Sequence, residues 1–287
     1  MTVSAQIDAH LPALTPAERR VAAVVADDPE AVAFGTVADV ARRSGASGAT
    51  VVRLATKLGF DGFVELQASV REELARRLRP ASERIRRPSP GDVLGTALAT
   101  EMANVAATLD AVDRSAFDRA VELFSGAPTG RRRGSPRLFV LSGDASSGVA
   151  SLFAAELSML RPGVTPVAGS EVRVARLLAE VAPGDVAAVF DLARYDRAVV
   201  DAAGRAVERG AVLLALTDSS LSPLASLATV HFTASVTGCG PFDSHVGHLA
   251  LSNALLAGVA ARLRRGATDR LDQVESAWRE ADALIDG

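Results

Sequence analysis

The sequence predicts two domains of different class: an all-α N-terminal domain and a three-layer α/β domain with a parallel sheet. Apolar residues recur at helical spacing through about the first 80 residues. A proline-rich, charged segment follows at 80–91. From residue 138 onward, short runs of Val, Leu and Ala alternate with helical segments, which is typical of a parallel sheet covered on both faces. We therefore expect domains at 1–79 and 92–287, joined by a linker at 80–91.

The first strong helix begins at a capping box. Thr15 is the expected cap, Pro16 takes the first helical position, and Glu18 stands three residues after the cap. A short helix follows through Ala33. Asp61 is the expected cap of the last helix of this domain, which runs to about residue 79.

Between these helices, residues 36–59 predict two short helices joined by a tight turn. Thr36 caps the first, with Asp39 in the acidic position of a capping box. Gly45 breaks that helix, because glycine reaches left-handed dihedrals without steric cost. Ser47 caps the second helix, which ends at Gly59. This order is the helix-turn-helix pattern, whose second helix enters the DNA major groove with its N-terminus first.

The outer face of the second helix offers candidate contacts to double-stranded DNA. Gly48 and Ala49 permit close approach to base edges, Thr50 suits a thymine methyl group or a phosphate, and Arg53 reaches guanine in a bidentate contact. The remaining candidates are expected at phosphates or at the helix start: Arg42, Arg43, Ser47 and Lys57. The alternative is an ordinary helical hairpin with a polar outer face.

The second half of the chain alternates between strands and helices. Helices are expected at 92–109 and 115–124, before the first strand. Strands are expected at 138–141, 164–167, 185–190, 212–216 and 230–233. Helices are expected between them at 147–160, 172–181 and 197–209, with a long one at about 244–263. In such sheets, ligands bind beyond the carboxyl ends of the strands.

Three loops gather polar side chains at those strand ends, at 142–147, 191–197 and 217–225. The first opens a helix, so its backbone amides favour an anion. For each loop, a plain strand-to-helix turn rich in capping residues is the alternative. His245 and His248 are three residues apart, which is more typical of a polar helix surface than of a catalytic or metal site. We expect no cofactor and no metal.

Charge and cysteine content narrow the location and the partners. Residues 1–90 carry 13 Lys and Arg against 11 Asp and Glu, whereas the remainder carries 18 against 23. This weak asymmetry suits a DNA-reading front domain. The single cysteine, Cys239, excludes an internal disulfide. No signal peptide or apolar stretch of membrane-spanning length is apparent, so we expect a cytoplasmic protein without a membrane partner.

Residues 14–74 closely resemble the N-terminal domain of RpiR-type transcriptional regulators. The most specific part comprises Ser47, the run Ala49 to Arg53, and the run Lys57 to Phe60. Gly48 departs from the family, which usually has a larger residue there. Glycine at this position weakens the helix start by up to about 1 kcal/mol relative to alanine.

Residues 138–233 resemble the SIS (sugar isomerase) domain that these regulators carry as an effector sensor. The resemblance implies a sugar-phosphate ligand. The family commonly places Ser-x-Ser-Gly-x-Thr after the third strand to hold phosphate, and this chain aligns Asp191, Ala193, Arg194 and Asp196 with those Ser, Ser, Gly and Thr positions. Either Arg194 replaces the anion contact, or the two aspartates bind a polyol or cation. The hypothesised effector pocket is Ser146, Ser147, Asp191, Arg194, Tyr195 and Ser222.

Together these observations predict a DNA-binding transcriptional regulator that responds to a small metabolite, a sugar phosphate or a related carbohydrate-pathway compound. We expect a homodimer or homotetramer on a pseudo-palindromic operator, with helices 92–124 and the SIS-like domain as the dimerising parts. Two alternatives stay open. One is a sugar-phosphate isomerase or another enzyme with a helical appendage. The other is a metabolite-binding protein whose DNA role has decayed.

Overall fold

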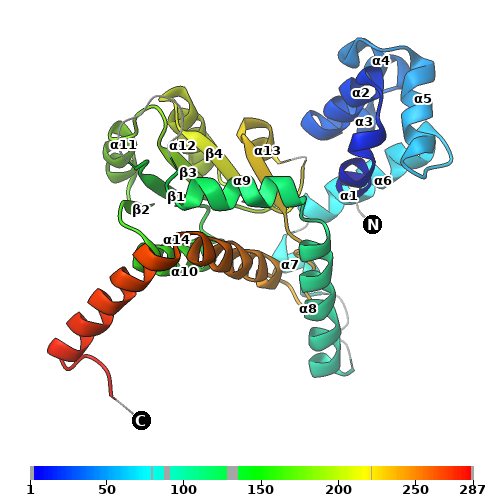
Figure 1. Ribbon diagram of the computed structural model, residues 1–287. Coiled ribbons are helices and arrows are strands. Elements are labelled where there is room, and N and C mark those ends of the chain that lie inside the picture. The colour runs from blue at the N-terminus through cyan, green and yellow to red at the C-terminus, as the bar shows by residue number, and fades with distance from the viewer. Residues whose placement is uncertain (1–2, 79, 87–90, 128–134, 221, 286–287) are drawn as a thin grey trace.

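The computed structural model describes residues 3–78, 80–86, 91–127, 135–220 and 222–285. The front of the chain is a helical bundle and the rear is a layered α/β unit (Figure 1). Residue 79 and residues 87–90, at the predicted helix end and in the predicted linker, lie outside the described ranges.

The bundle packs around one apolar core. Its elements are α1 (Val3–His10), a 3-10 turn (Leu11–Ala13), α2 (Pro16–Asp27), α3 (Pro29–Phe34), α4 (Val37–Ser44), α5 (Gly48–Lys57) and α6 (Phe63–Leu78). Helices α2, α4 and α5 pack on one another, and α3 packs on α6. Helix α1 is not among the predicted helices; Val3 and Ile7 anchor it in the core. The Val3 backbone N–H also donates to the Glu73 carboxylate at 2.9 Å.

The connection to the rear unit is helical. It contains α7 (Ala81–Arg84), α8 (Val93–Asp110) and α9 (Arg114–Phe124). The Arg84 guanidinium pairs with the carboxylate of Asp243, which ties α7 to the loop after the last strand. A polar network docks α8 on the same loop: Asn104 donates to the Thr237 carbonyl at 2.8 Å and accepts from Ser235 Oγ at 2.8 Å.

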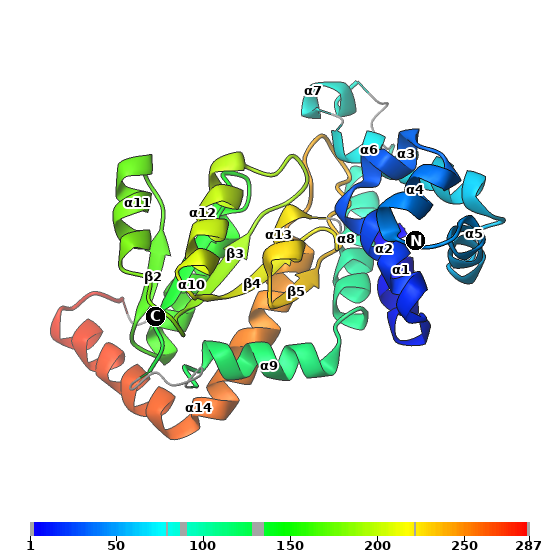
Figure 2. The ribbon, with the colours of Figure 1, turned by 90° about the horizontal axis from the view of Figure 1, so that it is seen from above.

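Five parallel strands form the central sheet, in the order β2-β1-β3-β4-β5. They are β1 (Leu138–Ser142), β2 (Val164–Val167), β3 (Val186–Phe190), β4 (Val212–Thr217) and β5 (Val230–Thr233). Helices α9, α10 (Ser147–Leu160) and α14 (Val246–Glu280) cover one face. Helices α11 (Glu171–Ala179), α12 (Arg197–Glu208) and α13 (Pro223–Leu227) cover the other (Figure 2). This confirms the predicted fold class.

Helix α14 extends 17 residues beyond its predicted end at 263, after a break in helical geometry at Arg264. By length and composition it is apolar enough to cross a membrane, so the expectation that no stretch reaches that length is wrong. Leu251, Leu255 and Val259 of α14 are nevertheless buried in the core of the α/β unit. Much of its apolar character therefore serves packing against α10.

The strand order determines where the topological switch point of the sheet lies. From β1 the chain passes through α10 on one face, and from β3 it passes through α12 on the other. Because these two connections diverge, the carboxyl ends of β1 and β3 flank the topological switch point of the sheet. Ser142 pairs with Phe190 there, directly before the two loops that the sequence singles out.

Candidate functional site

The helix-turn-helix has the local geometry that the sequence predicts. Thr36 and Asp39 form the capping box of α4, and Gly45 ends that helix in the left-handed region at φ 59°. Ser47 caps α5 by accepting from the Thr50 N–H at 3.2 Å. Val51, Leu54 and Ala55 of α5 are fully buried. This packing fixes which side of α5 faces outward.

The N-terminal end of α5 presents small side chains and one cation. Ser47, Ala49 and Arg53 are exposed. Gly48 is half-buried, and a β-carbon there would lie 3.2 Å from a methyl group of Val37. The crowding at Val37 gives a steric reason for glycine at this departure from the family pattern.

Two predicted DNA contacts, Thr50 and Lys57, have partners within the protein. Thr50 is only 6% exposed, so its placement on the outer face is wrong. Its hydroxyl lies 2.9 Å from Ser47 Oγ and accepts from Arg53 Nη2 at 3.3 Å, which orients the arginine. Lys57 Nζ donates to the Ala13 carbonyl and to Glu18, both at 2.9 Å. Lys57 therefore has partners within the bundle, but 36% of its side chain is exposed, so its predicted phosphate contact stays a prediction.

Glu18 is the buried partner of Lys57. Hydrogen bonds from Thr15 and Lys57 lower the pKa of Glu18 to about 2. Its carboxylate completes the capping box of α2 while it receives the lysine from α5. Lys57 therefore fastens the candidate recognition helix to α2, a role that spacing along α5 does not reveal.

The other arginines of the motif divide into exposed and structural groups. Arg42 pairs with Asp39 at 2.6 Å and Arg43 pairs with Asp28, and both side chains remain largely exposed. Arg20 of α2 is not among the predicted functional residues. It donates to the carbonyls of Ser44 at 3.1 Å and of Gly45 at 3.3 Å. Arg20 therefore satisfies the C-terminal carbonyls of α4 and holds the turn.

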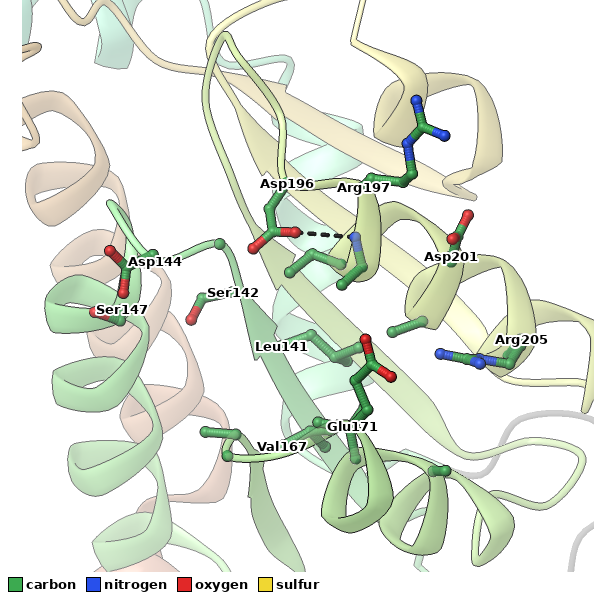
Figure 3. Close-up of a pocket in the computed structure, with 18 of the residues that line it drawn as sticks. Leu141, Ser142, Asp144, Ser147, Val167, Glu171, Asp196, Arg197, Asp201 and Arg205 are labelled. Atoms are coloured by element: carbon green, nitrogen blue, oxygen red, sulfur yellow. Dashed lines mark hydrogen bonds between the residues drawn. The ribbon is translucent and has the colours of Figure 1, made fainter. Parts of the chain in front are cut away.

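A pocket of about 970 Å³ lies at the carboxyl ends of β1 and β2, between α10, α11 and α12. Glu171 and Asp196 point into it from opposite sides, and Arg205 reaches in along α12 (Figure 3). The Arg197 side chain points away. The polar or charged residues that line the pocket are Ser142, Asp144, Ser147, Glu171, Asp196, Arg197, Asp201 and Arg205. Leu141 and Val167 contribute to its apolar wall.

The predicted effector residues do not converge on this pocket. Ser147 lines it, but Ser146, Asp191, Arg194, Tyr195 and Ser222 do not. Ser222 is buried and caps α13 by accepting from the Leu224 N–H at 3.1 Å. Ser146 is buried at the start of α10, and its hydroxyl has no partner among the described residues. Both serines are predicted ligand contacts, whereas their side chains are enclosed.

Asp191 serves its own loop. Its carboxylate accepts from the N–H groups of Leu192 at 2.9 Å and Asp196 at 2.8 Å. The side chain is buried, and a β-carbon at Gly143 would lie 2.3 Å from Asp191 Oδ1. Burial raises the pKa of Asp191 to about 6, against the opposing effect of these hydrogen bonds.

The rest of the loop after β3 follows from this anchor. Arg194 is exposed and adopts φ 70°, the left-handed conformation that glycine adopts most readily. This matches its alignment with the glycine of the family loop. The Tyr195 hydroxyl donates to Asp218 at 2.7 Å, so the tyrosine bridges the loops after β3 and β4. Within the described ranges, no group of three His, Cys, Asp or Glu side chains is arranged to hold a metal.

Comparison with known protein families separates the two halves of the chain. Residues 1–77 match the model described as "Helix-turn-helix domain, rpiR family", and residues 133–257 match the SIS domain. The chain is 27% identical to the HTH-type transcriptional regulator HexR of Pseudomonas aeruginosa over 270 residues, covering 91% of this chain and 89% of HexR. It is 25% identical to Escherichia coli HexR, covering 98% and 96%.

Solved structures give the same relationship. The sugar isomerase domain of an RpiR transcription factor from Sphaerobacter thermophilus is 30% identical, with a TM-score of 0.59. That match covers 64% of this chain and 99% of the other. Vibrio vulnificus NanR, complexed with ManNAc-6P, is 22% identical with a TM-score of 0.57 and covers 99% of this chain and 100% of NanR, a similarity of fold.

Proposed function

This chain belongs to the RpiR family of transcriptional regulators, and we propose that it reads its operator with the N-terminal end of α5. The observation that carries the proposal is the exposed Arg53 beside the small residues Ser47, Gly48 and Ala49. Small residues let the helix start approach base edges, and arginine suits guanine. Arg42 and Arg43 flank this face as phosphate contacts.

The test is selection of bound sequences from a random DNA pool by the full-length protein. Arg53→Ala should relax the selected motif or weaken binding by about tenfold or more, since a bidentate base contact discriminates by about 1–3 kcal/mol. Arg209→Ala is the matched control, because it removes the same charge at the far end of α12. Equal motifs from wild type and Arg53→Ala would remove Arg53 from base recognition.

We further propose that the operator is pseudo-palindromic and is bound by a homo-oligomer, with a homodimer as the basic unit. The support is an unpartnered apolar stripe on α8. Leu94, Leu98 and Met102 recur at four-residue spacing and are 84%, 64% and 64% exposed. A single helix-turn-helix buries too little surface for tight specific binding, so two copies are needed. Sedimentation should show Leu98→Glu shifted toward monomer, whereas Val64→Glu, at an exposed apolar residue of α6, should leave the assembly intact.

The SIS domain is proposed to sense a small metabolite in the pocket between α11 and α12, rather than to convert it. The relatives named above are transcriptional regulators, and NanR is described in complex with ManNAc-6P. A metabolite that binds one arrangement of the front domains more tightly shifts the population toward it. The test is operator affinity with and without a fraction of small cellular metabolites. Unchanged affinity with every fraction would count against sensing.

A further inference from the structure

The loop between β3 and α12 is built like an anion site. Its backbone N–H groups lie at the carboxyl edge of a parallel sheet and at the start of a twelve-residue helix. Such groups favour negative charge through unpaired donors and the helix dipole. Which anion occupies the position decides what the neighbouring pocket can bind.

In this chain, the occupant is a side chain of the loop itself. The Asp191 carboxylate takes the Leu192 N–H on one oxygen and the Asp196 N–H on the other. The Asp196 carboxylate in turn takes the Ala198 N–H at 2.9 Å, the contact drawn as a dashed line in Figure 3. These N–H groups therefore already bind two internal carboxylates.

The facing loop approaches the Asp191 carboxylate closely at Gly143. A β-carbon on Gly143 would lie 2.3 Å from Asp191 Oδ1 and 2.7 Å from its carboxyl carbon. The carboxylate thus fills the space between the ends of β1 and β3, where the two loops diverge. Glycine at 143 is required by this approach, since any larger residue meets the carboxylate.

The lining carries four carboxylates against two arginines, of which only Arg205 reaches into the pocket, so its net charge is also unfavourable to a phosphate. Asp196 lines the pocket at the start of α12, and Asp144 lines it from the loop after β1. Glu171 points in from α11 (Figure 3). Carboxylates repel a phosphate dianion, whereas they accept hydrogen bonds from hydroxyl and ammonium groups.

We propose that the Asp191 carboxylate is a permanent substitute for a ligand phosphate, so that the pocket binds a hydroxyl-rich ligand, uncharged or positively charged, that carries no phosphate group. This inference rests on the proposed sensing role of the pocket. Hydroxyl or ammonium groups of the ligand donate to Glu171 and Asp196, and its carbon skeleton lies against Leu141 and Val167.

Calorimetric titration of inorganic phosphate into the full-length protein tests the substitution. Wild type should show no saturable binding at millimolar phosphate. Asp191→Ser frees the two N–H groups and adds a hydroxyl donor, so its affinity for phosphate should rise by about tenfold or more. Asp201→Ser is the matched control, because it removes one carboxylate from the pocket wall without freeing those N–H groups. Saturable binding by wild type, or an equal gain in both variants, would overturn the proposal.

A second experiment uses wild type alone and does not depend on the folding of a variant. Small cellular metabolites are separated on an anion exchanger, and each fraction is added to the protein on its selected operator. The fraction that changes operator affinity should be the unretained one, which holds neutral and cationic compounds. Activity confined to the retained, phosphorylated fraction would overturn the inference while supporting the sensing role. Activity in neither fraction would contradict the sensing role instead.

Discussion

Replacing Asp191 with asparagine removes a carboxyl group whose pKa burial raises from 3.8 to about 6. Since one pKa unit corresponds to about 1.4 kcal/mol, ionisation of Asp191 costs the folded chain about 3 kcal/mol relative to the unfolded chain. The cost is absent only well below pH 3.8, where the carboxyl is protonated in both states. It grows as the pH rises from about 4 to 6 and is complete above that range.

The asparagine variant carries no such cost at any pH. It leaves the Asp196 N–H facing an amide NH₂ or a poorer acceptor, which costs about 1–3 kcal/mol independently of pH. The difference in free energy of unfolding between variant and wild type should therefore change by about 2.5 kcal/mol between pH 4 and pH 7. The change should favour the variant at the higher pH.

Urea denaturation of the full-length protein, followed by circular dichroism at stepped pH, measures this difference. The helical bundle is identical in both proteins, so its own pH dependence cancels. Asp201→Asn serves as the control, because it makes the same substitution at an exposed aspartate of α12. A difference between Asp191→Asn and wild type that stays constant from pH 4 to 7 would refute the assignment of Asp191 as a buried, ionised group.

Three further substitutions test the packing around the two sites. Gly143→Ala should destabilise the α/β unit by about 1–3 kcal/mol through contact with the Asp191 carboxylate. The double variant Gly143→Ala with Asp191→Gly should regain that lost stability, as measured by thermal unfolding. Lys57→Met should lower the melting temperature of the bundle, because Glu18 loses its lysine partner and keeps only the Thr15 N–H. The slope of DNA affinity against salt concentration should stay the same, and a slope reduced by about one would make Lys57 a phosphate contact. Gly45→Ala should destabilise the bundle by about 1–2 kcal/mol, because its φ of 59° is left-handed; unchanged denaturant stability would contradict this.

Local signals in the sequence predict most of the fold because they act over a few residues. The capping boxes at Thr15 and Thr36 and the turn at Gly45 have the predicted hydrogen bonds and dihedrals. Helix α1 escapes prediction because its stabilisation is distant in sequence. Val3 donates to Glu73, 70 residues away, and the helix has no acidic residue in its first turn to indicate a start.

Side-chain roles are predicted less well than elements, because a polar group that faces outward on a helical wheel still has partners from other elements. Lys57 belongs to the polar side of α5, yet Glu18, 39 residues earlier, takes its charge. Asp191 belongs to a strand-end loop rich in polar residues, yet it bonds its own loop and fills the space that Gly143 leaves, 48 positions earlier. Arg194 shows the opposite case, since its left-handed backbone is a property of the local chain and agrees with its alignment to a glycine position, although no such backbone was predicted.

The contrast between locally determined backbone conformation and side-chain partners from other elements explains how one family fold can change its ligand without changing its architecture. An anion position at a helix start needs backbone donors and a negative occupant, and the occupant can belong to the ligand or to the chain. Here a single residue, Asp191, satisfies the donors internally, while strand order and helix packing keep the pocket in place. The positive φ of Arg194 is then expected, because the loop has a conformation suited to binding an anion, and the anion that it binds is the Asp191 carboxylate.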